Sequence, residues 1–330
     1  MSSWTQWNSR LPSFLPLVVI LSLLLVTVMA SAGDRSLVYK RCLSNCKYIN
    51  CLGVSDEVFA SAQPVYLRWL QWGCLDECKY ECMWQAVDAY EKDGSKIPQF
   101  HGKWPFIRLL GIQEPASVIA SLLNFLSVTL GMMVFWKTVP SYSPMYFVWN
   151  FYGFVCLNAW FWSTIFHCRD LEFTERLDYF TALSLVMSST LCFCLRFART
   201  QPLWKSFIIP LPFFTYYVYH CYYLSYVNFN YSYNMTVNIS FGLFSSAAWI
   251  TWCAYRWKER PYVKRCILAL LILNGSVIFE VFDFAPTFWV FDAHSLWHIG
   301  TVPVGYLWFS FAADDCIHIS DTLKKKNKIL

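Results

Sequence analysis

Five polar side chains lie inside or beside long apolar stretches of this sequence. Ser163 and His167 are in the stretch NAWFWSTIFH, Asp178 is in ERLDYF, and His294 and His298 are in DAHSLWH. An ionisable group in a bilayer costs several kcal/mol unless it is paired or hydrated, so such residues indicate function. Residues four apart on a helix point the same way. Ser163 with His167, and His294 with His298, are therefore each expected to share one helix face.

These residue types fit a zinc-dependent hydrolytic site. The neutral imidazoles of His167, His294 and His298 can fill three positions of a tetrahedral Zn²⁺ ion and leave the fourth for water. The ion would lower the pKa of that water to about 7 and polarise a carbonyl group. Asp178 is then the expected general base, while Ser163 orients the water or stabilises the oxyanion. A Ser163 nucleophile with a histidine base is the alternative arrangement.

Ordinary structural roles compete with each of these assignments. A single histidine at a membrane interface more often hydrogen-bonds a neighbour than binds a metal, and Asp178 could cap a helix or reach the surface. Glu280 and Asp283, in FEVFDF, are expected to hydrogen-bond a ligating histidine or to support helix packing. Three further histidines have no similar pattern of polar residues near them and are interpreted as structural or surface residues: His101, His220 and His318.

The elements that hold the five residues are predicted to be membrane helices. Of the 330 residues, 57% are hydrophobic and only 14% are charged, and the apolar residues occur in blocks. This composition is typical of an integral membrane protein. The net charge of +5 comes from short basic clusters between the blocks, so nucleic-acid binding is not expected. Seven blocks of roughly 20 residues could each cross a bilayer: 116–136, 145–166, 178–195, 206–224, 237–255, 266–284 and 294–313.

The N-terminus predicts a secretory signal peptide, residues 1–32. Arg10 precedes an apolar run that is followed by ASA, so cleavage is expected after Ala32, with an uncleaved signal anchor as the alternative. Residues 33–113 are then expected in the lumen. The connections that follow odd-numbered helices, and the tail 314–330, are rich in lysine and arginine, which places them in the cytosol. The predicted fold is an all-α, seven-helix membrane core, residues 114–313, preceded by a small lumenal domain.

Residues 33–113 contain six cysteines in two clusters of three. In an oxidising lumen such a set predicts disulfides rather than a zinc site, and the pairing stays open: Cys42, Cys46, Cys51, Cys74, Cys78 and Cys82. The other cysteines lie in or beside apolar segments and are expected to act as small hydrophobes. Asn230 and Asn234 begin glycosylation sequons in the loop between the fourth and fifth predicted helices, which the charge pattern also places in the lumen.

The five polar residues resemble the pattern of the CREST superfamily of membrane hydrolases and receptors. That pattern is a Ser-x3-His, a downstream Asp and a late His-x3-His on a seven-helix core, and it is shared by alkaline ceramidases and adiponectin-type receptors. Longer strings are similar, more specifically, to the Per1-like family of post-GPI-attachment factors, over nearly all of the mature sequence. They include GDRSLVYKRC, CKYECMW, PQFHGKWPF, LNAWFWSTIFH and DAHSLWHIGTVP.

The resemblance implies a reaction and its partners. It implies phospholipase A2-like removal of the unsaturated sn-2 fatty acid from glycosylphosphatidylinositol (GPI)-anchored proteins, at the lumenal membrane surface and with Zn²⁺. GPI-anchored proteins and membrane lipids would then be the partners. Two alternatives stay open. One is a ceramidase-like amidase, which the same metal chemistry permits. The other is a non-catalytic seven-span receptor or lipid chaperone, in which the metal is structural.

The C-terminal sequence KNKIL bears on location. Lys326 and Lys328 resemble a dilysine retrieval signal that COPI-type machinery reads, while basic charge on the cytosolic side is the alternative explanation. We therefore expect a multi-pass protein of the early secretory pathway, in the endoplasmic reticulum or the Golgi apparatus. Its active site would be lumenal and its C-terminus cytosolic.

Overall fold

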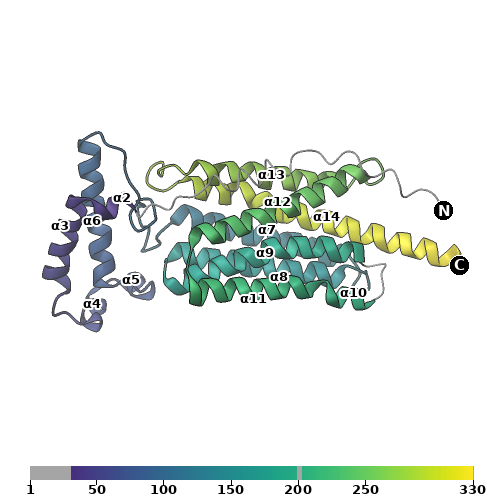
Figure 1. Ribbon diagram of the computed structural model, residues 1–330, viewed down its shortest axis with the longest axis horizontal. Helices are drawn as coiled ribbons and strands as arrows, with labels where there is room; N and C mark the ends of the chain where they lie inside the picture. The colour runs from purple at the N-terminus through teal and green to yellow at the C-terminus, as the bar shows by residue number, and fades with distance from the viewer. Residues whose placement is uncertain (1–30, 199–202, 330) are drawn as a thin grey trace.

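The computed structural model describes residues 31–198 and 203–329, and these residues are almost entirely helical. Within those ranges the extended pairings are three isolated bridges, with no strand. A long helical bundle carries a smaller cysteine-rich region, residues 31–113, at one end, and α6 of that region runs across the axis of the bundle (Figure 1). The predicted all-α class is confirmed. The predicted signal peptide falls almost wholly on residues 1–30, outside the described ranges.

The cysteine-rich region is built from several short helices followed by one longer helix. Ser36 and Ser55 begin two of these helices, because each side chain accepts a hydrogen bond from a backbone N–H of the first turn. The segments are α2 (Ala32–Arg35), α3 (Leu37–Cys46), the π-helical η1 (Lys47–Cys51), α4 (Asp56–Ala62), α5 (Val65–Trp69) and α6 (Cys74–Lys92).

Three disulfides hold α3 and η1 against α6. The core between them is small, with Tyr39, Ala86, Val87 and Phe100 as its main buried side chains. A core of this size gives little stability by itself, so covalent cross-links are needed. The predicted disulfides are confirmed, and their pairing, which the sequence left open, is Cys42–Cys82, Cys46–Cys78 and Cys51–Cys74.

The bundle contains the predicted apolar segments, with different boundaries. The fourth segment is broken at Pro210, which has no N–H to continue a helix from the preceding turn. The fifth helix starts six residues earlier than predicted, at Tyr231 rather than 237, and the last continues far past 313 to Ile329. The helices are α7 (Pro115–Thr138), α8 (Tyr146–Cys168), α9 (Glu172–Ala198), α10 (Leu203–Ile208), α11 (Pro210–Tyr222), the π-helical η2 (Tyr223–Val227), α12 (Tyr231–Arg256), α13 (Val263–Phe282) and α14 (Ala293–Ile329).

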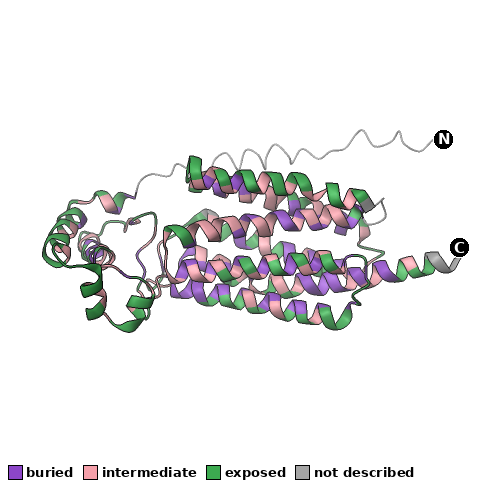
Figure 2. Cartoon of the chain, turned by 90° about the horizontal axis from the view of Figure 1, so that it is seen from below, coloured by how far each residue is buried: buried purple, intermediate pink, exposed green. Residues whose placement is uncertain are grey.

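Three of these helices, α7, α9 and α12, are long and apolar enough to cross a membrane. The bundle interior is aromatic, and Trp149, Trp249 and Phe311 are fully buried there. Its outer faces expose large apolar side chains, such as Phe147, Phe214 and Phe244, and Figure 2 shows that exposed residues line the outside of the helices. Apolar side chains on an outer surface require an apolar surrounding. The chain is a membrane protein, and crossing by all seven predicted segments stays a prediction.

Small residues bring α7 and α14 close together. A Cβ atom added to Gly131 would lie 2.8 Å from Cβ of Phe309, and one added to Gly305 would lie 2.8 Å from the Val128 side chain. Such close backbone approach is typical of helix pairs in membranes. Asp292 also fixes the start of α14, because its side chain accepts a hydrogen bond of 2.8 Å from the Ser295 N–H. The position of His298 on α14 is thereby fixed relative to α7.

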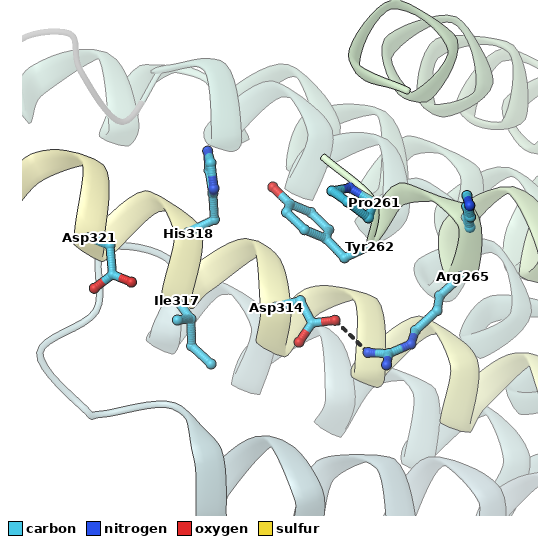
Figure 3. A pocket seen from close by; sticks show the side chains of 8 residues that line it. Pro261, Tyr262, Arg265, Asp314, Ile317, His318 and Asp321 are labelled. Atoms are coloured by element: carbon cyan, nitrogen blue, oxygen red, sulfur yellow. Dashed lines mark hydrogen bonds and ion pairs between the residues drawn. The ribbon is translucent and has the colours of Figure 1, made fainter. Parts of the chain in front are cut away.

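The opposite end of the bundle contains a second group of charged residues. The buried Arg196 guanidinium donates two hydrogen bonds, of 2.6 and 2.7 Å, to the Asp315 carboxylate, and Tyr262 donates a third of 2.8 Å. A shallow pocket beside them is lined by α13 and α14, including His318 and an ion pair of Arg265 with Asp314 (Figure 3). His318 follows His298 by five to six helical turns, about 30 Å along α14. This pocket is therefore separate from the predicted site.

Candidate metal centre

Three histidines meet at the end of the bundle nearest the cysteine-rich region. His167 lies in the last turn of α8, while His294 and His298 lie in the first two turns of α14. The ring centroid of His167 is 5.2 Å from that of His294 and 5.1 Å from that of His298. One nitrogen from each ring lies within 4.8 Å of the others. The structure therefore brings together the three histidines that were predicted from sequence as metal ligands.

The outward ring nitrogens of two of these histidines are held by carboxylates. Nδ1 of His167 is 2.7 Å from Oε2 of Glu114, and Nδ1 of His294 is 2.8 Å from Oε2 of Glu280. A carboxylate at Nδ1 fixes the orientation and tautomer of a ligating imidazole and leaves Nε2 for a metal. The expectation that Glu280 contacts a histidine is confirmed. Asp283 instead accepts hydrogen bonds from Gln99 and Trp104 of the cysteine-rich region, so its expected histidine contact is wrong.

The spacing of the inner nitrogens fits a small cation. Nε2 of His294 and Nε2 of His298 are 2.9 Å apart. Two nitrogens on a tetrahedral zinc ion, each about 2.0 Å from it, would be about 3.3 Å apart, so a small ring movement is enough. The side chain of His167 is only 2% exposed, whereas that of His294 is 36% exposed. His294 is therefore the most accessible of the three histidines.

Helix α7 supplies two polar residues that sequence reasoning missed. Ser121 is fully buried, and its Oγ lies 3.1 Å from Oγ of Ser163 and 3.5 Å from Nδ1 of His298. Asn124 donates a hydrogen bond of 2.7 Å to the backbone oxygen of His298. A sequence pattern could have identified both residues. A polar residue occurs every three or four positions along one face of this otherwise apolar helix, at Ser117, Ser121, Asn124 and Ser127.

Ser163 and Asp178, the other two predicted site residues, differ in their contacts. Ser163 is 5% exposed, and among the described residues its hydroxyl bonds to Ser121 and to no histidine. Asp178 lies in the second turn of α9, and its carboxylate interacts electrostatically with His167 and His294. The described residues give that carboxylate no hydrogen bond that would occupy it.

Glu114 and Lys103 form a buried ion pair at the edge of the site. Nζ of Lys103 is 2.5 Å from Oε1 of Glu114 and 3.0 Å from Oδ2 of Asp170. Burial opposes ionisation of Glu114, but the Lys103 ammonium and His167 together hold the pKa of that carboxyl well below its usual value. Burial likewise opposes the charge on Lys103, and the two carboxylates outweigh it and raise the pKa of Lys103. Both shifts favour the charged forms of the pair.

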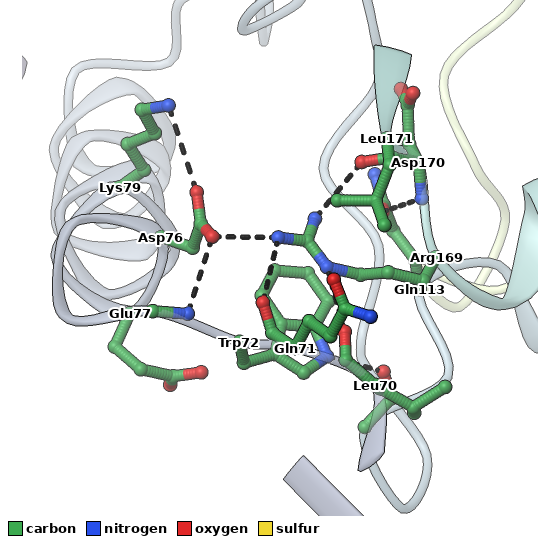
Figure 4. A network of polar contacts seen from close by, with 12 residues as sticks. Leu70, Gln71, Trp72, Asp76, Glu77, Lys79, Gln113, Arg169, Asp170 and Leu171 are labelled. Carbon is green, nitrogen blue, oxygen red and sulfur yellow. Dashed lines mark hydrogen bonds and ion pairs between the residues drawn. The ribbon is translucent and has the colours of Figure 1, made fainter. Parts of the chain in front are cut away.

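A second polar network joins the cysteine-rich region to the same end of the bundle. The Arg169 guanidinium, just after α8, bonds Oδ2 of Asp76 at 2.6 Å and the backbone oxygen of Leu70 at 3.1 Å (Figure 4). It also lies 3.8 Å from the centre of the Trp72 ring, and Arg108 lies 4.1 Å from the same ring. The cysteine-rich region is therefore fixed against the loop that follows His167.

A second group of potential metal-ligating atoms carries no metal-binding role. The sulfur atoms of Cys51, Cys74 and Cys78 lie close together. Each of them is already in a disulfide, and a disulfide sulfur lacks the thiolate that binds zinc. The eight other cysteines are unpaired, and five of them are buried in the bundle as expected.

The predicted glycosylation sites differ in accessibility. Asn230 caps α12, and its Oδ1 accepts a hydrogen bond of 3.0 Å from the Tyr233 N–H, which leaves its Nδ2 for a glycan. Asn234 lies inside α12, is 6% exposed and accepts a hydrogen bond from Asn238. The predicted loop is only three residues long here, 228–230, because the helix begins earlier. The folded structure can therefore accommodate a glycan on Asn230 but not on Asn234.

The three remaining histidines lie away from the metal centre. His101 is in the cysteine-rich region and bonds Tyr39, His220 is buried against Tyr233, and His318 is near the far end of α14.

Comparison with known proteins places the chain in a family. The model of the Per1-like family matches residues 64–316. A Homo sapiens protein named GPI-specific phospholipase A2-like PGAP3 is 44% identical over 91% of this chain and 93% of its own length. A protein of the same name from Cricetulus griseus is 43% identical over 94% of this chain and 98% of its own length.

A more distant relative carries a related name. The Drosophila melanogaster protein named post-GPI attachment to proteins factor 3 is 39% identical over 92% of this chain and 93% of its own length. No solved structure matches the chain. The family match covers most of the chain and includes all three histidines, so the resemblance predicted from sequence is confirmed: the chain belongs to the Per1-like family.

Proposed function

We propose that this protein is a zinc-dependent lipid hydrolase that removes the sn-2 fatty acid from the lipid of GPI-anchored proteins. The convergence of one ring nitrogen from each of His167, His294 and His298 is the main observation that supports the proposal. Two of the rings are oriented by carboxylates, and three protein ligands leave one position open, which is typical of catalytic rather than structural zinc.

The surrounding residues suit ester hydrolysis. Zinc bound there would lower the pKa of a water molecule to about 7 and polarise the ester carbonyl. Asp178 would accept a proton from the water as its oxygen attacks the carbonyl carbon, and would then return a proton to the glycerol oxygen as the acyl bond breaks. The products are a fatty acid and a lipid with a free sn-2 hydroxyl. Ser163 and Ser121, 3.1 Å apart, would donate to the carbonyl oxygen as it gains charge.

The geometry gives less support to a serine nucleophile. A serine must bond a general base before it can attack a carbonyl. The Ser163 hydroxyl bonds the neutral hydroxyl of Ser121, while the described contacts of the three histidines are to carboxylates, to one another and, for His298, to Ser121 at 3.5 Å. We therefore favour Ser163 as a positioning group for the carbonyl or the water.

The relatives' names and the site's place in the bundle support the lipid substrate. The vertebrate relatives are named as GPI-specific and phospholipase A2-like. The histidines lie at the ends of α8 and α14, where the ester bonds of a membrane lipid are found, rather than at mid-membrane. Three disulfides suit an oxidising compartment, so we propose that this end of a seven-span core faces the lumen.

The proposed location is the early secretory pathway. GPI-anchored proteins traverse the endoplasmic reticulum and Golgi lumen, and the lysine-rich end of the chain, with Lys326 and Lys328, would face the cytosol. COPI-type retrieval machinery would then be a partner there.

The decisive experiment combines lipid analysis in cells with a purified assay. In cells that lack this protein, we expect GPI anchors to retain an unsaturated sn-2 chain, and the wild-type chain should restore its removal. Purified protein should release fatty acid from a GPI lipid. Release of fatty acid from ceramide instead would favour the amidase, and restored remodelling by a zinc-free variant would favour a receptor or chaperone.

A further inference from the structure

Lys103 connects the cysteine-rich region to the metal centre. Its Nζ lies 2.5 Å from Oε1 of Glu114, 3.0 Å from Oδ2 of Asp170 and 4.2 Å from the centre of the Phe166 ring. The Lys103 side chain is 23% exposed and that of Glu114 only 6%. A single ammonium group therefore contacts the residue before α7, the end of α8 and the loop after α8.

The two oxygens of Glu114 have different partners. Oε1 accepts from Lys103, and Oε2 contacts Nδ1 of His167 at 2.7 Å. The backbone of Glu114 is already fixed, because its N–H donates to the His167 oxygen at 3.1 Å, as the Gln113 N–H does to Cys168 at 3.0 Å. The hydrogen bond from Lys103 additionally fixes the orientation of the Glu114 carboxylate. That carboxylate in turn sets the orientation of the His167 ring.

The backbone of Lys103 is fixed by the core of the cysteine-rich region. The N–H and C=O of Lys103 both pair with Phe100, at 2.9 and 2.7 Å. His101 and Gly102, between them, have φ values of +50° and +80°, which make the tight turn that such pairing needs. Phe100 is buried in the same small core as Cys82, which the Cys42–Cys82 disulfide holds. A continuous set of contacts thus runs from the disulfides to His167.

We propose that Lys103 is a positioning residue of the metal site, so that the cysteine-rich region completes this site in addition to any role in recognition. The inference rests on the proposed function, since it assumes that His167 binds a metal. Loss of the ammonium would leave Glu114 with one partner in a buried setting, and it could then turn away from His167. Mutation of a group that hydrogen-bonds a ligating histidine, as Glu114 does His167, lowers metal affinity by about 10- to 100-fold in known sites, and loss of Lys103 acts through that group.

The test compares zinc affinity among purified full-length variants in detergent, measured by competition with a chelator. We expect Lys103→Met to bind zinc about 10- to 100-fold more weakly than the wild type. Lys103→Arg should recover most of the affinity because it keeps the charge. Lys92→Met is the matched control, since Lys92 is an exposed lysine in the last turn of α6 for which the described residues show no ion pair, and the zinc affinity of this variant should stay unchanged.

A double-mutant cycle separates positioning from general loss of structure. Because Lys103 acts through Glu114, Lys103→Met should have no further effect on zinc affinity in a Glu114→Gln background. Unchanged affinity in Lys103→Met, an arginine variant as weak as the methionine variant, or a full additional loss in the Glu114→Gln background would each overturn the inference. A wild-type chain that binds no zinc would instead overturn the proposed function. The two failures are therefore distinguishable.

Discussion

The cysteine-rich region and the bundle use the same residue type in opposite ways. All six cysteines of the small region are in disulfides, because its core of a few side chains cannot hold α3 against α6 without them. The eight cysteines elsewhere are unpaired. Several of them, including Cys192, Cys253 and Cys316, are buried in the large aromatic core of the bundle. Surrounding packing therefore decides whether a cysteine is a cross-link or a hydrophobe.

The two regions also contribute differently to the site. The bundle supplies the three histidines, Asp178 and Ser163, which are the residues that we propose for the chemistry. The cysteine-rich region supplies Lys103, which touches Glu114 and not the histidines themselves. The comparison predicts that damage to the bundle residues abolishes chemistry, whereas damage to the cysteine-rich region lowers stability and weakens metal binding.

The largest effect is expected from removal of a ligand. His298→Ala leaves two imidazoles, which cannot close the coordination shell, so the purified variant should lose its zinc and all hydrolytic activity. Metal analysis of the purified protein provides the measurement. The three disulfides should still form, because His298 makes no contact with the cysteine-rich region in the described structure. If His298→Ala keeps its full zinc content, His298 is not a zinc ligand.

Loss of the general base should be nearly as severe but should spare the metal. Asp178→Asn keeps the shape of the side chain and removes its ability to accept a proton. We expect the variant to fold and to keep zinc, while its rate of fatty-acid release falls by about 10² to 10⁴. Cells that express only this variant should retain unsaturated sn-2 chains on GPI anchors. Full restoration of remodelling by Asp178→Asn would exclude the role.

Sequence patterns predicted the cluster of three histidines because its signals are local. Two pairs spaced by four, at Ser163 with His167 and His294 with His298, must lie on single helix faces, and helix ends on one side of a membrane lie at a similar depth. Glu114 and Lys103 were missed because their roles depend on tertiary contacts. Glu114 precedes Pro115 and could be interpreted as an ordinary helix boundary, and nothing near Lys103 in the sequence indicates that a turn directs it toward α8.

The helix boundaries show a similar limit. Each predicted apolar segment overlaps a helix, but its bounds differ. Asn234 was assigned to a loop because a single sequence does not reveal that it hydrogen-bonds Asn238 inside α12. The disulfide pairing could not be predicted either, since six cysteines allow many pairings and only the packing of α3 on α6 selects one.

A disulfide variant tests the cysteine-rich region directly. Replacing both Cys46 and Cys78 with alanine removes the middle cross-link, and we expect it to destabilise that region by about 2 to 5 kcal/mol. Protease susceptibility of residues 31–113 should rise, while the bundle should stay resistant. A similar pair of substitutions at Cys192 and Cys253, which are unpaired, should leave the cysteine-rich region unchanged and serves as the control. Equal protease susceptibility of residues 31–113 in the two double variants would show that this region does not depend on its disulfide for stability.

The smallest expected effect concerns the two sequons at the start of α12, and it tests which side of the membrane this end of the bundle faces. Asn230 caps the helix and has an available Nδ2, whereas Asn234 is buried, so a glycan should be present on Asn230 alone. Ser232→Ala removes the first sequon and leaves the Asn230 cap intact, and it should abolish the shift in gel mobility that endoglycosidase produces. Thr236→Ala removes the second sequon and should leave that shift unchanged. Asn230→Gln would confuse the result, because it also removes a cap that stabilises the helix by about 1 kcal/mol. If Thr236→Ala rather than Ser232→Ala abolishes the mobility shift, α12 begins later than in the structure. If the wild-type chain shows no shift and a tag at 228–230 is reachable from the cytosol, the metal centre lies on the cytosolic side of the membrane.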